Sequence, residues 1–140
     1  MIIVDTNVLS EFMRPTPAAT AASWLAQQDG DQLWTTTITE AELLVGAATL
    51  PAGRRRAELE RNIDATLSRF SHRILSFDRD AARHLAVVFS QRRAQHLDMK
   101  LADGQIAAIA RAYGAAVATR DIDDFAHTGI SVINPWTTQP

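Results

Sequence analysis

Apolar residues along the chain form two kinds of run. Short runs, mostly rich in β-branched or aromatic residues, predict five strands, at residues 2–4, 33–37, 74–77, 115–119 and 131–133. Longer runs, several with apolar residues three and four apart, predict helices at 18–28, 39–48, 54–70, 79–94 and 102–112. Strands that alternate with helices favour right-handed crossovers, so we expect an α/β fold whose mainly parallel sheet is covered by helices on both faces.

Composition limits the class of protein. The chain has 140 residues, of which 46% are apolar, 21% are charged and none is Cys. These values predict one packed domain over residues 1–140 and argue against a disulfide framework, a thiolate zinc site and a disordered chain. No apolar run approaches the length of about 18 residues that crosses a bilayer, and the N-terminus does not resemble a signal peptide. We therefore expect a cytoplasmic protein without a membrane segment.

Acidic residues follow the predicted strands, and ligands of parallel sheets bind beyond the carboxyl ends of the strands. Asp5 directly follows the first strand, Asp121 follows the fourth, and Glu42 lies one turn into the helix after the second. Asp103 stands at the start of the helix over 102–112, and the strand rule alone does not bring it to the same edge. Each acid taken singly also fits a helix cap, a helix N-terminal turn or a solvated helix position.

Taken together, the four acids indicate a cation. Clustered carboxylates raise one another's pKa unless positive charge is present, and an all-oxygen set suits Mg²⁺ or Mn²⁺ rather than zinc. Residues two apart on a helix face roughly opposite ways, so Glu40 and Glu42 cannot both contribute. Glu42 has Thr39 before it and Gly46 after it, which favours close approach on its face. Glu40 is expected to face solvent.

Four segments together resemble the motifs of a known family. They are VDTNVL at 4–9, ITEAELLVG at 38–46, ADGQIAA at 102–108, and ATRD at 118–121 followed by Asp124 and Phe125. In this order they are similar to the motifs of PIN-domain ribonucleases, most of all to the VapC toxins of bacterial toxin–antitoxin pairs in the FitB-like branch. The resemblance spans nearly the whole chain.

The resemblance implies a three-layer α/β/α sandwich with a five-stranded sheet, in which Asp103 joins Asp5, Glu42 and Asp121. It implies cleavage of RNA that depends on one or two Mg²⁺ or Mn²⁺ ions, and it assigns Thr6, Asn7 and Thr119 to support of the metal pocket. Two acids, Asp121 and Asp124, compete for the last position of the site. Gly104 departs from the Ala that is more usual after the acid, and we expect this to affect packing more than chemistry.

The same resemblance implies partners. It predicts a homodimer, assembly to higher order with an antitoxin, and a small antitoxin protein that occludes the active site of a type II toxin. An Arg of that antitoxin would pair with the acidic residues and exclude metal and RNA together.

The mechanistic hypothesis is in-line hydrolysis of an RNA phosphodiester by a metal-activated water. The resemblance implies that the products carry 5'-phosphate and 3'-hydroxyl ends. A pair of His residues that would use the RNA 2'-hydroxyl is not evident, because the four His residues are scattered along the chain. They are His72, His84, His96 and His127.

Charge is unevenly distributed, with a net charge of -5 over residues 1–53, +5 over 54–100 and -2 over the remainder. Arginines of the middle third would form a basic rim that draws an RNA backbone over the acidic pocket. The candidates are Arg54, Arg55, Arg56, Arg61 and Arg69. The same helix has an apolar stripe, so it fits a dimer or antitoxin contact equally well. The stripe consists of Leu59, Ile63, Leu67 and Phe70.

Two other classes stay open. A Mg²⁺-dependent phosphatase also places an Asp after its first strand, but the haloacid-dehalogenase pattern needs a second Asp where this chain has Asn7. A receiver domain needs a Lys after a late strand, and the sole Lys, Lys100, precedes a helix. The other class is a non-catalytic RNA- or protein-binding module that keeps the fold. Four clustered acids without a metal carry an electrostatic cost, which favours the nuclease.

Overall fold

The computed structural model describes residues 1–137 and has an α/β architecture. Five strands pair in parallel, in the order β3-β2-β1-β4-β5. Their bounds are Ile2–Val4 (β1), Leu33–Thr36 (β2), Ile74–Leu75 (β3), Ala116–Ala118 (β4) and Val132–Ile133 (β5). The predicted parallel sheet is confirmed, with strands up to two residues shorter than their apolar runs.

Seven α-helices connect the strands in the described part of the chain. Their bounds are Thr6–Phe12 (α1), Ala19–Ala26 (α2), Thr37–Ala48 (α3), Arg54–Ser68 (α4), Arg79–Ala94 (α5), Leu101–Tyr113 (α6) and Ile122–Phe125 (α7). The five predicted helices are present, α5 with its predicted ends and the other four with ends shifted by one or two residues, whereas α1 and α7 are additional. A 3-10 turn, Gly30–Gln32, precedes β2.

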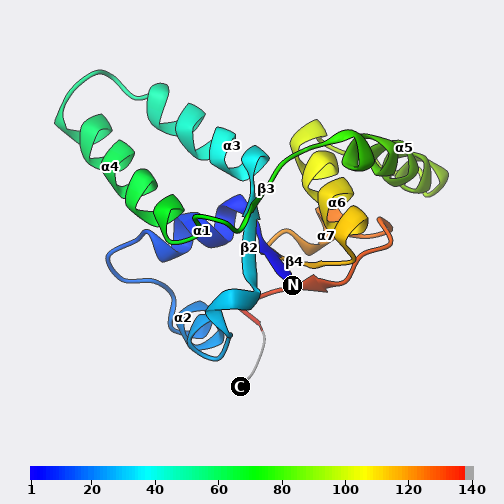
Figure 1. The fold of residues 1–140 in the computed structure, drawn as a ribbon, viewed down its shortest axis with the longest axis horizontal. Coiled ribbons are helices and arrows are strands. Elements are labelled where there is room, and N and C mark those ends of the chain that lie inside the picture. Colours follow the sequence, from blue (N-terminus) through cyan, green and yellow to red (C-terminus); the bar gives the residue numbers. More distant parts are fainter. Residues whose placement is uncertain (138–140) are drawn as a thin grey trace.

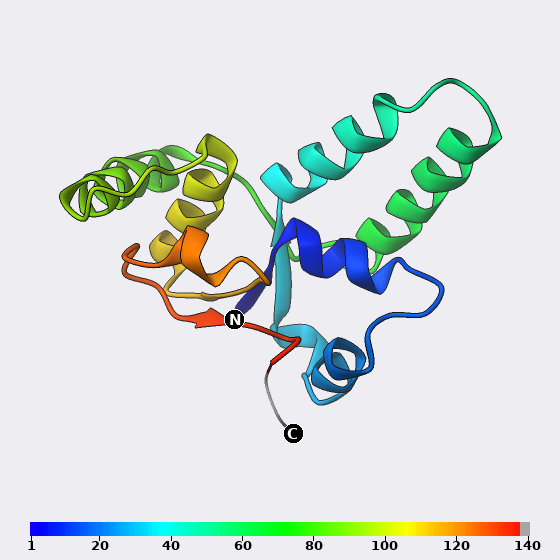
Figure 2. The same cartoon turned by 180° about the vertical axis from the view of Figure 1, so that it is seen from behind.

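The sheet separates two hydrophobic cores, as expected for a three-layer sandwich (Figures 1 and 2). Ile3 and Val117 face the core beneath α5, α6 and α7, whereas Val4 and Ala118 face the core beneath α1 to α4. Alternate residues of a strand point to opposite faces, so both cores are filled from the same short strands. All four strand residues are fully buried.

Helix α4 contributes its apolar stripe to the protein's own core. Ile63, Leu67 and Phe70 are buried together with residues of α1 and α3, and Leu59 is partly buried against them. Three of the four stripe residues therefore belong to this chain's own core, while Leu59 and Ile63 also line a groove between α1, α3 and α4. An amphipathic stripe alone does not say whether its partner belongs to the same chain.

Gly104 lets α6 approach α5 closely. A Cβ at this position would lie 2.5 Å from Cε2 of Phe89 and 3.1 Å from Cδ1 of Leu85. The expectation that Gly104 affects packing is confirmed, since the ring of Phe89 takes the space that an Ala methyl would need.

The strand order determines where on the sheet edge a ligand site is expected. The chain moves from β1 to β2 and β3 on one side, and later adds β4 and β5 on the other side of β1. The carboxyl ends of β1 and β4 are thus adjacent at the point where the strand order reverses, which is where open α/β sheets bind ligands. Asp5 and Asp121 follow these two strands. Within residues 1–137, no helix has the length and apolar character needed to cross a membrane.

Candidate active site

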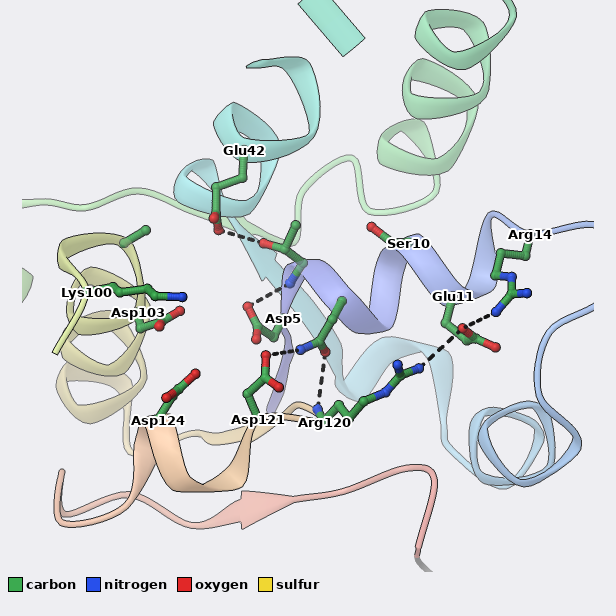
Figure 3. A pocket seen from close by; sticks show the side chains of 13 residues that line it. Asp5, Ser10, Glu11, Arg14, Glu42, Lys100, Asp103, Arg120, Asp121 and Asp124 are labelled. Carbon is green, nitrogen blue, oxygen red and sulfur yellow. Dashed lines mark hydrogen bonds and ion pairs between the residues drawn. The ribbon is translucent and has the colours of Figure 1, made fainter. Parts of the chain in front are cut away.

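A pocket of about 620 Å³ opens at this edge of the sheet, and carboxylates surround it (Figure 3). All four predicted acids line it, although they come from four separate parts of the chain. Two further acids, Glu11 and Asp124, also line the pocket. The complete lining consists of Asp5, Thr6, Asn7, Ser10, Glu11, Arg14, Glu42, Lys100, Ala102, Asp103, Arg120, Asp121 and Asp124.

Asp5 is the most buried of the predicted acids, with only 5% of its surface exposed. It is the N-cap of α1, and its Oδ1 accepts a hydrogen bond of 2.7 Å from the backbone N–H of Thr6. Its Oδ2 accepts a hydrogen bond of 2.8 Å from the hydroxyl of Thr119. Burial raises the pKa of Asp5, and both hydrogen bonds oppose that rise because they favour the carboxylate.

Thr6 joins the first helix to Glu42 on α3. Its hydroxyl lies 2.7 Å from Oε1 of Glu42 and donates to it, which fixes that carboxylate at the rim of the pocket. The hydroxyl oxygen also lies 3.2 Å from that of Thr39. Glu42 lines the pocket as predicted, whereas Glu40 does not. Glu40 is half-buried and lies outside this lining.

Asn7 and Thr119 connect the ends of β1 and β4. The side-chain amide of Asn7 donates to Thr119 Oγ1 at 3.2 Å and to Asp121 Oδ2 at 3.0 Å. Thr119 Oγ1 also accepts from the backbone N–H of Asp121 at 3.1 Å. The three residues assigned a supporting role by resemblance, Thr6, Asn7 and Thr119, thus each hold one or more of the acids.

Asp103 and Asp124 lie on the other side of the pocket, beside Lys100 (Figure 3). Burial, together with the negative charges of Asp5, Asp124 and Glu42, raises the pKa of Asp103 to about 6, and the charge of Lys100 opposes the rise. Asp121 is hydrogen-bonded to Asn7, and Asp124 faces Asp103. The sequence left Asp121 and Asp124 as alternatives, and the structure brings both to the pocket.

The chemistry of this set fits a divalent cation. Every donor is an oxygen, and burial together with repulsion from neighbouring acids raises the pKa of Asp103, an effect that a bound cation would oppose. Within residues 1–137, no three acidic or His side chains already converge on a single point. Mg²⁺ commonly keeps several waters and takes only one or two carboxylates from the protein, so an open ring of acids suits it.

Comparison with known proteins agrees with the geometry. Residues 2–130 match the family model described as the PIN domain. This chain belongs to the PIN-domain family. The plasmid stability protein StbB of Pseudomonas syringae pv. tomato is 43% identical, over 97% of this chain and 99% of its own. VapC ribonuclease Y4jK of Sinorhizobium fredii is 39% identical, over 97% of this chain and 98% of its own.

A third relative of this PIN domain has the name Toxin FitB and comes from Neisseria gonorrhoeae. It is 36% identical over 97% of this chain and 99% of its own. The crystal structure of FitAcB from the same organism superposes with a TM-score of 0.91 at 36% identity, covering 99% of this chain and 100% of the other. The PIN-like fold expected from the sequence motifs is therefore confirmed.

The predicted basic rim is absent from the pocket of this PIN domain. Within residues 1–137, its lining includes none of the five candidate arginines Arg54, Arg55, Arg56, Arg61 and Arg69. Two of them form ion pairs along α4 instead, Arg54 with Glu58 and Arg56 with Glu60. Charge density along a helix does not reveal which of its ends or faces approaches a site, so a role of these arginines in RNA binding stays a prediction. None of the four His residues lines the pocket in this part of the chain either.

Three other basic side chains line the pocket instead. Arg14, Lys100 and Arg120 line the pocket, and sequence reasoning assigned a role to none of them. A signal was available, because Asn7, Ser10, Glu11 and Arg14 recur at spacings of three, four and seven, which is one helix face. That face went unrecognised because α1 was not among the predicted helices.

Proposed function

We propose that this PIN domain is a Mg²⁺- or Mn²⁺-dependent endoribonuclease that hydrolyses RNA phosphodiester bonds. The observation that carries the proposal is the convergence of Asp5, Glu42, Asp103, Asp121 and Asp124 on one open pocket. Membership of the PIN family and the likeness to a protein named VapC ribonuclease support the reaction class.

Asp5 and Asp103 would hold the cation, with Glu42 and Asp121 or Asp124 completing the acidic pocket. A bound divalent cation would supply the positive charge that acidifies a water molecule and offsets charge on the phosphate. Thr119 and the first turn of α1 fix Asp5 through hydrogen bonds that favour its ionised form. Asn7 holds Asp121, and Thr6 holds Glu42, so the acidic side chains are oriented before substrate arrives.

The protein would act as the toxin of a type II toxin–antitoxin pair in the cytoplasm. Likeness to Toxin FitB and to the solved FitAcB supports this role. An apolar groove of about 500 Å³ between α1, α3 and α4 shares Thr6, Ser10, Arg14 and Glu42 with the acidic pocket. An antitoxin segment lying in this groove would reach the acids and occlude them.

The same proposal includes a homodimer. Apolar side chains are exposed on α5 and at the start of α6, among them Phe89 at 36% and Leu101 at 59%. Leu101 is two residues from Asp103, so a protomer contact there would lie near the acidic pocket. Light scattering behind size exclusion gives the mass that tests this part of the proposal.

A phosphatase of the haloacid-dehalogenase type is less well supported. Position 7 would need a carboxylate, and the amide of Asn7 instead donates to Thr119 and Asp121. A carboxylate there would repel Asp121. The non-catalytic module remains the alternative that experiment must exclude.

The test is incubation of purified, antitoxin-free protein with total bacterial RNA and Mg²⁺ or Mn²⁺. Parallel reactions contain a chelator, the Asp103→Asn variant, or Asp64→Asn, which changes an exposed acid of α4 outside the pocket lining. Discrete cuts that carry 5'-phosphates, lost with chelator and in Asp103→Asn but kept in Asp64→Asn, are expected. Cleavage that survives both chelator and Asp103→Asn would reflect contamination. Intact RNA bound by wild-type protein in the presence of either metal would favour the non-catalytic module.

A further inference from the structure

A buried carboxylate at one end of the pocket holds two arginines. The side chain of Glu11 is only 4% exposed, and its Oε2 lies 3.3 Å from Arg14 and 3.5 Å from Arg120. Its other oxygen accepts a hydrogen bond of 2.7 Å from the backbone N–H of Ala18. The carboxylate is thus anchored to the start of α2 and is not free to follow either guanidinium.

The arginines themselves are exposed to the pocket. The side chain of Arg14 is 64% exposed and that of Arg120 is 53% exposed. Two positive charges share one negative charge, which leaves a net charge of +1 with donor groups free toward solvent. Guanidinium groups have five donors each and match the oxygens of phosphate bidentately.

Arg120 is held by further contacts. Its guanidinium carbon lies 4.1 Å from the ring centroid of Trp136, a cation–π arrangement, and its backbone N–H donates to Oδ1 of Asn7 at 3.2 Å. Asn7 also holds Asp121, so Arg120 and an acid of the site are fixed by the same side chain. Holding an exposed arginine in one conformation costs side-chain entropy. Because this cost is met before a ligand arrives, a ligand that binds the arginine loses less entropy.

The arginine pair and the acidic side chains lie in the same pocket. Figure 3 shows Glu11, Arg14 and Arg120 at one end of the pocket, Asp5 and Asp121 at its middle, and Lys100 and Asp103 at the other end. A polyanion crossing the acids would therefore reach the arginine pair within the same pocket.

From this geometry we infer that Arg14 and Arg120 form a binding subsite for a phosphate of the RNA backbone next to the scissile one, and that Glu11 and Trp136 hold them in position. The inference rests on the proposed nuclease function and names the part of the substrate that these residues recognise. A phosphate contact is independent of base identity, so the subsite contributes affinity and register rather than sequence preference.

Binding is tested apart from cleavage, in protein carrying Asp103→Asn and in metal-free buffer. A fluorescent single-stranded RNA oligonucleotide reports affinity by anisotropy over a range of salt concentrations. Arg14→Gln and Arg120→Gln are each expected to weaken binding by about tenfold and to reduce the salt dependence by about one ion. Arg83→Gln, at an exposed arginine of α5 outside the pocket lining, is the matched control and should leave both unchanged.

The position of the subsite relative to the scissile phosphate is tested with RNA substrates that carry one uncharged linkage. In the otherwise wild-type protein with metal, an uncharged methylphosphonate is placed at single positions around a mapped cleavage site. One neutral linkage beside the cut should raise the KM of wild-type protein, and the same linkage should have no added effect in Arg14→Gln or Arg120→Gln. Thermal melts confirm folding, and Arg14→Lys and Arg120→Lys should retain part of the affinity through charge alone.

Unchanged affinity and salt dependence in both Gln variants that melt like their parent would overturn the subsite. So would a neutral-linkage effect that persists in these variants. The two proposals fail separately. Wild-type protein that never cleaves RNA, together with arginine-dependent RNA binding, would overturn the nuclease and leave the subsite in place.

Discussion

The hydroxyl of Thr119, at the end of β4, donates a hydrogen bond of 2.8 Å to the carboxylate of Asp5, at the end of β1. The donor is fully buried and 114 positions away in sequence from its acceptor. The hydrogen bond that favours the ionised form of the most buried predicted acid therefore depends on the pairing of two strands.

Replacing Thr119 by Val should disable the site while the fold persists. The change removes the donor to Asp5 and the acceptor used by Asn7 and by the backbone of Asp121. We expect the pKa of Asp5 to rise and the affinity for Mn²⁺ to fall about 10- to 100-fold, as is usual when a supporting contact of a metal ligand is lost. Calorimetric titration with Mn²⁺ measures this. Thr119→Ser keeps the hydroxyl and should bind nearly as the parent does; equal losses in both variants would contradict the argument.

Asp103 should make metal-free protein less stable as pH rises. Its pKa is raised to about 6 in the folded state, against about 3.9 when unfolded, so between these values the folded state binds more protons. The free energy of unfolding therefore falls across this window. Asp103→Asn should be more stable than wild type at neutral pH, by about 1 kcal/mol once solvent screening is allowed for, with no such gain near pH 4.

Urea denaturation of both proteins in chelator, at a series of pH values, provides the measurement. Asp64→Asn is the control, as an exposed acid of α4. A gain for Asp103→Asn that does not change with pH would show that repulsion among the pocket acids is not its cause.

Glu11 should show the opposite dependence on pH. The backbone N–H of Ala18, with the nearby charges of Arg14 and Arg120, holds the pKa of this carboxyl below its ordinary value. A lowered folded-state pKa contributes stability above the unfolded value of about 4.3, and that contribution is lost as pH falls through the folded value. Glu11→Gln should therefore be less stable than wild type at neutral pH and approach it in acid. A thermal melt series over pH decides, and a destabilisation that persists unchanged in acid would indicate lost packing instead.

Arg92 should be needed for stability although it lines no part of the acidic pocket. Its side chain is buried, and its guanidinium donates to the carbonyls of Asp123 at 2.7 Å, Ala126 at 3.0 Å and Asp98 at 2.5 Å. The first two carbonyls belong to α7, which contains Asp124, and to the turn after it. The third belongs to the segment that leads into α6, which contains Asp103. Arg92→Met would leave them without this donor, at a cost of about 2–4 kcal/mol.

Chemical denaturation compares Arg92→Met with Arg93→Met, whose side chain is exposed on the same helix. Similar denaturation midpoints for the two variants would contradict a stabilising role of the Arg92 hydrogen bonds.

The sequence predicted the sheet well because each strand is a short apolar run between helical periods. It missed α7 because four residues make barely one turn. It missed α1 because a helix of seven residues gives only a weak cue, here the spacing of Asn7, Ser10 and Glu11. The acids Asp5, Glu42 and Asp121 followed from the rule on strand ends. Asp103 did not, because its position depends on how α6 packs, and only the family resemblance supplied it.

The cations of the pocket could not be predicted for a related reason. A run of arginines in α4 attracted attention by its density, but two of its members pair with glutamates of their own helix. Arg14 and Arg120 are single charges in unremarkable sequence. Their significance comes from a shared contact with Glu11, which joins residues more than a hundred positions apart.

Strand order also controls when during synthesis this protein becomes dangerous to its own cell, if it is the nuclease proposed here. The central strand β1 is made first, but its neighbour β4 begins at residue 116, and Asp121 and Asp124 follow it. A nascent chain that has not reached these residues lacks both one wall of the pocket and the donor that holds Asp5. We therefore expect nascent chains that end before β4 to lack hydrolytic activity. An inhibitor can be made during the time in which the chain is extended to β4 and the acids after it.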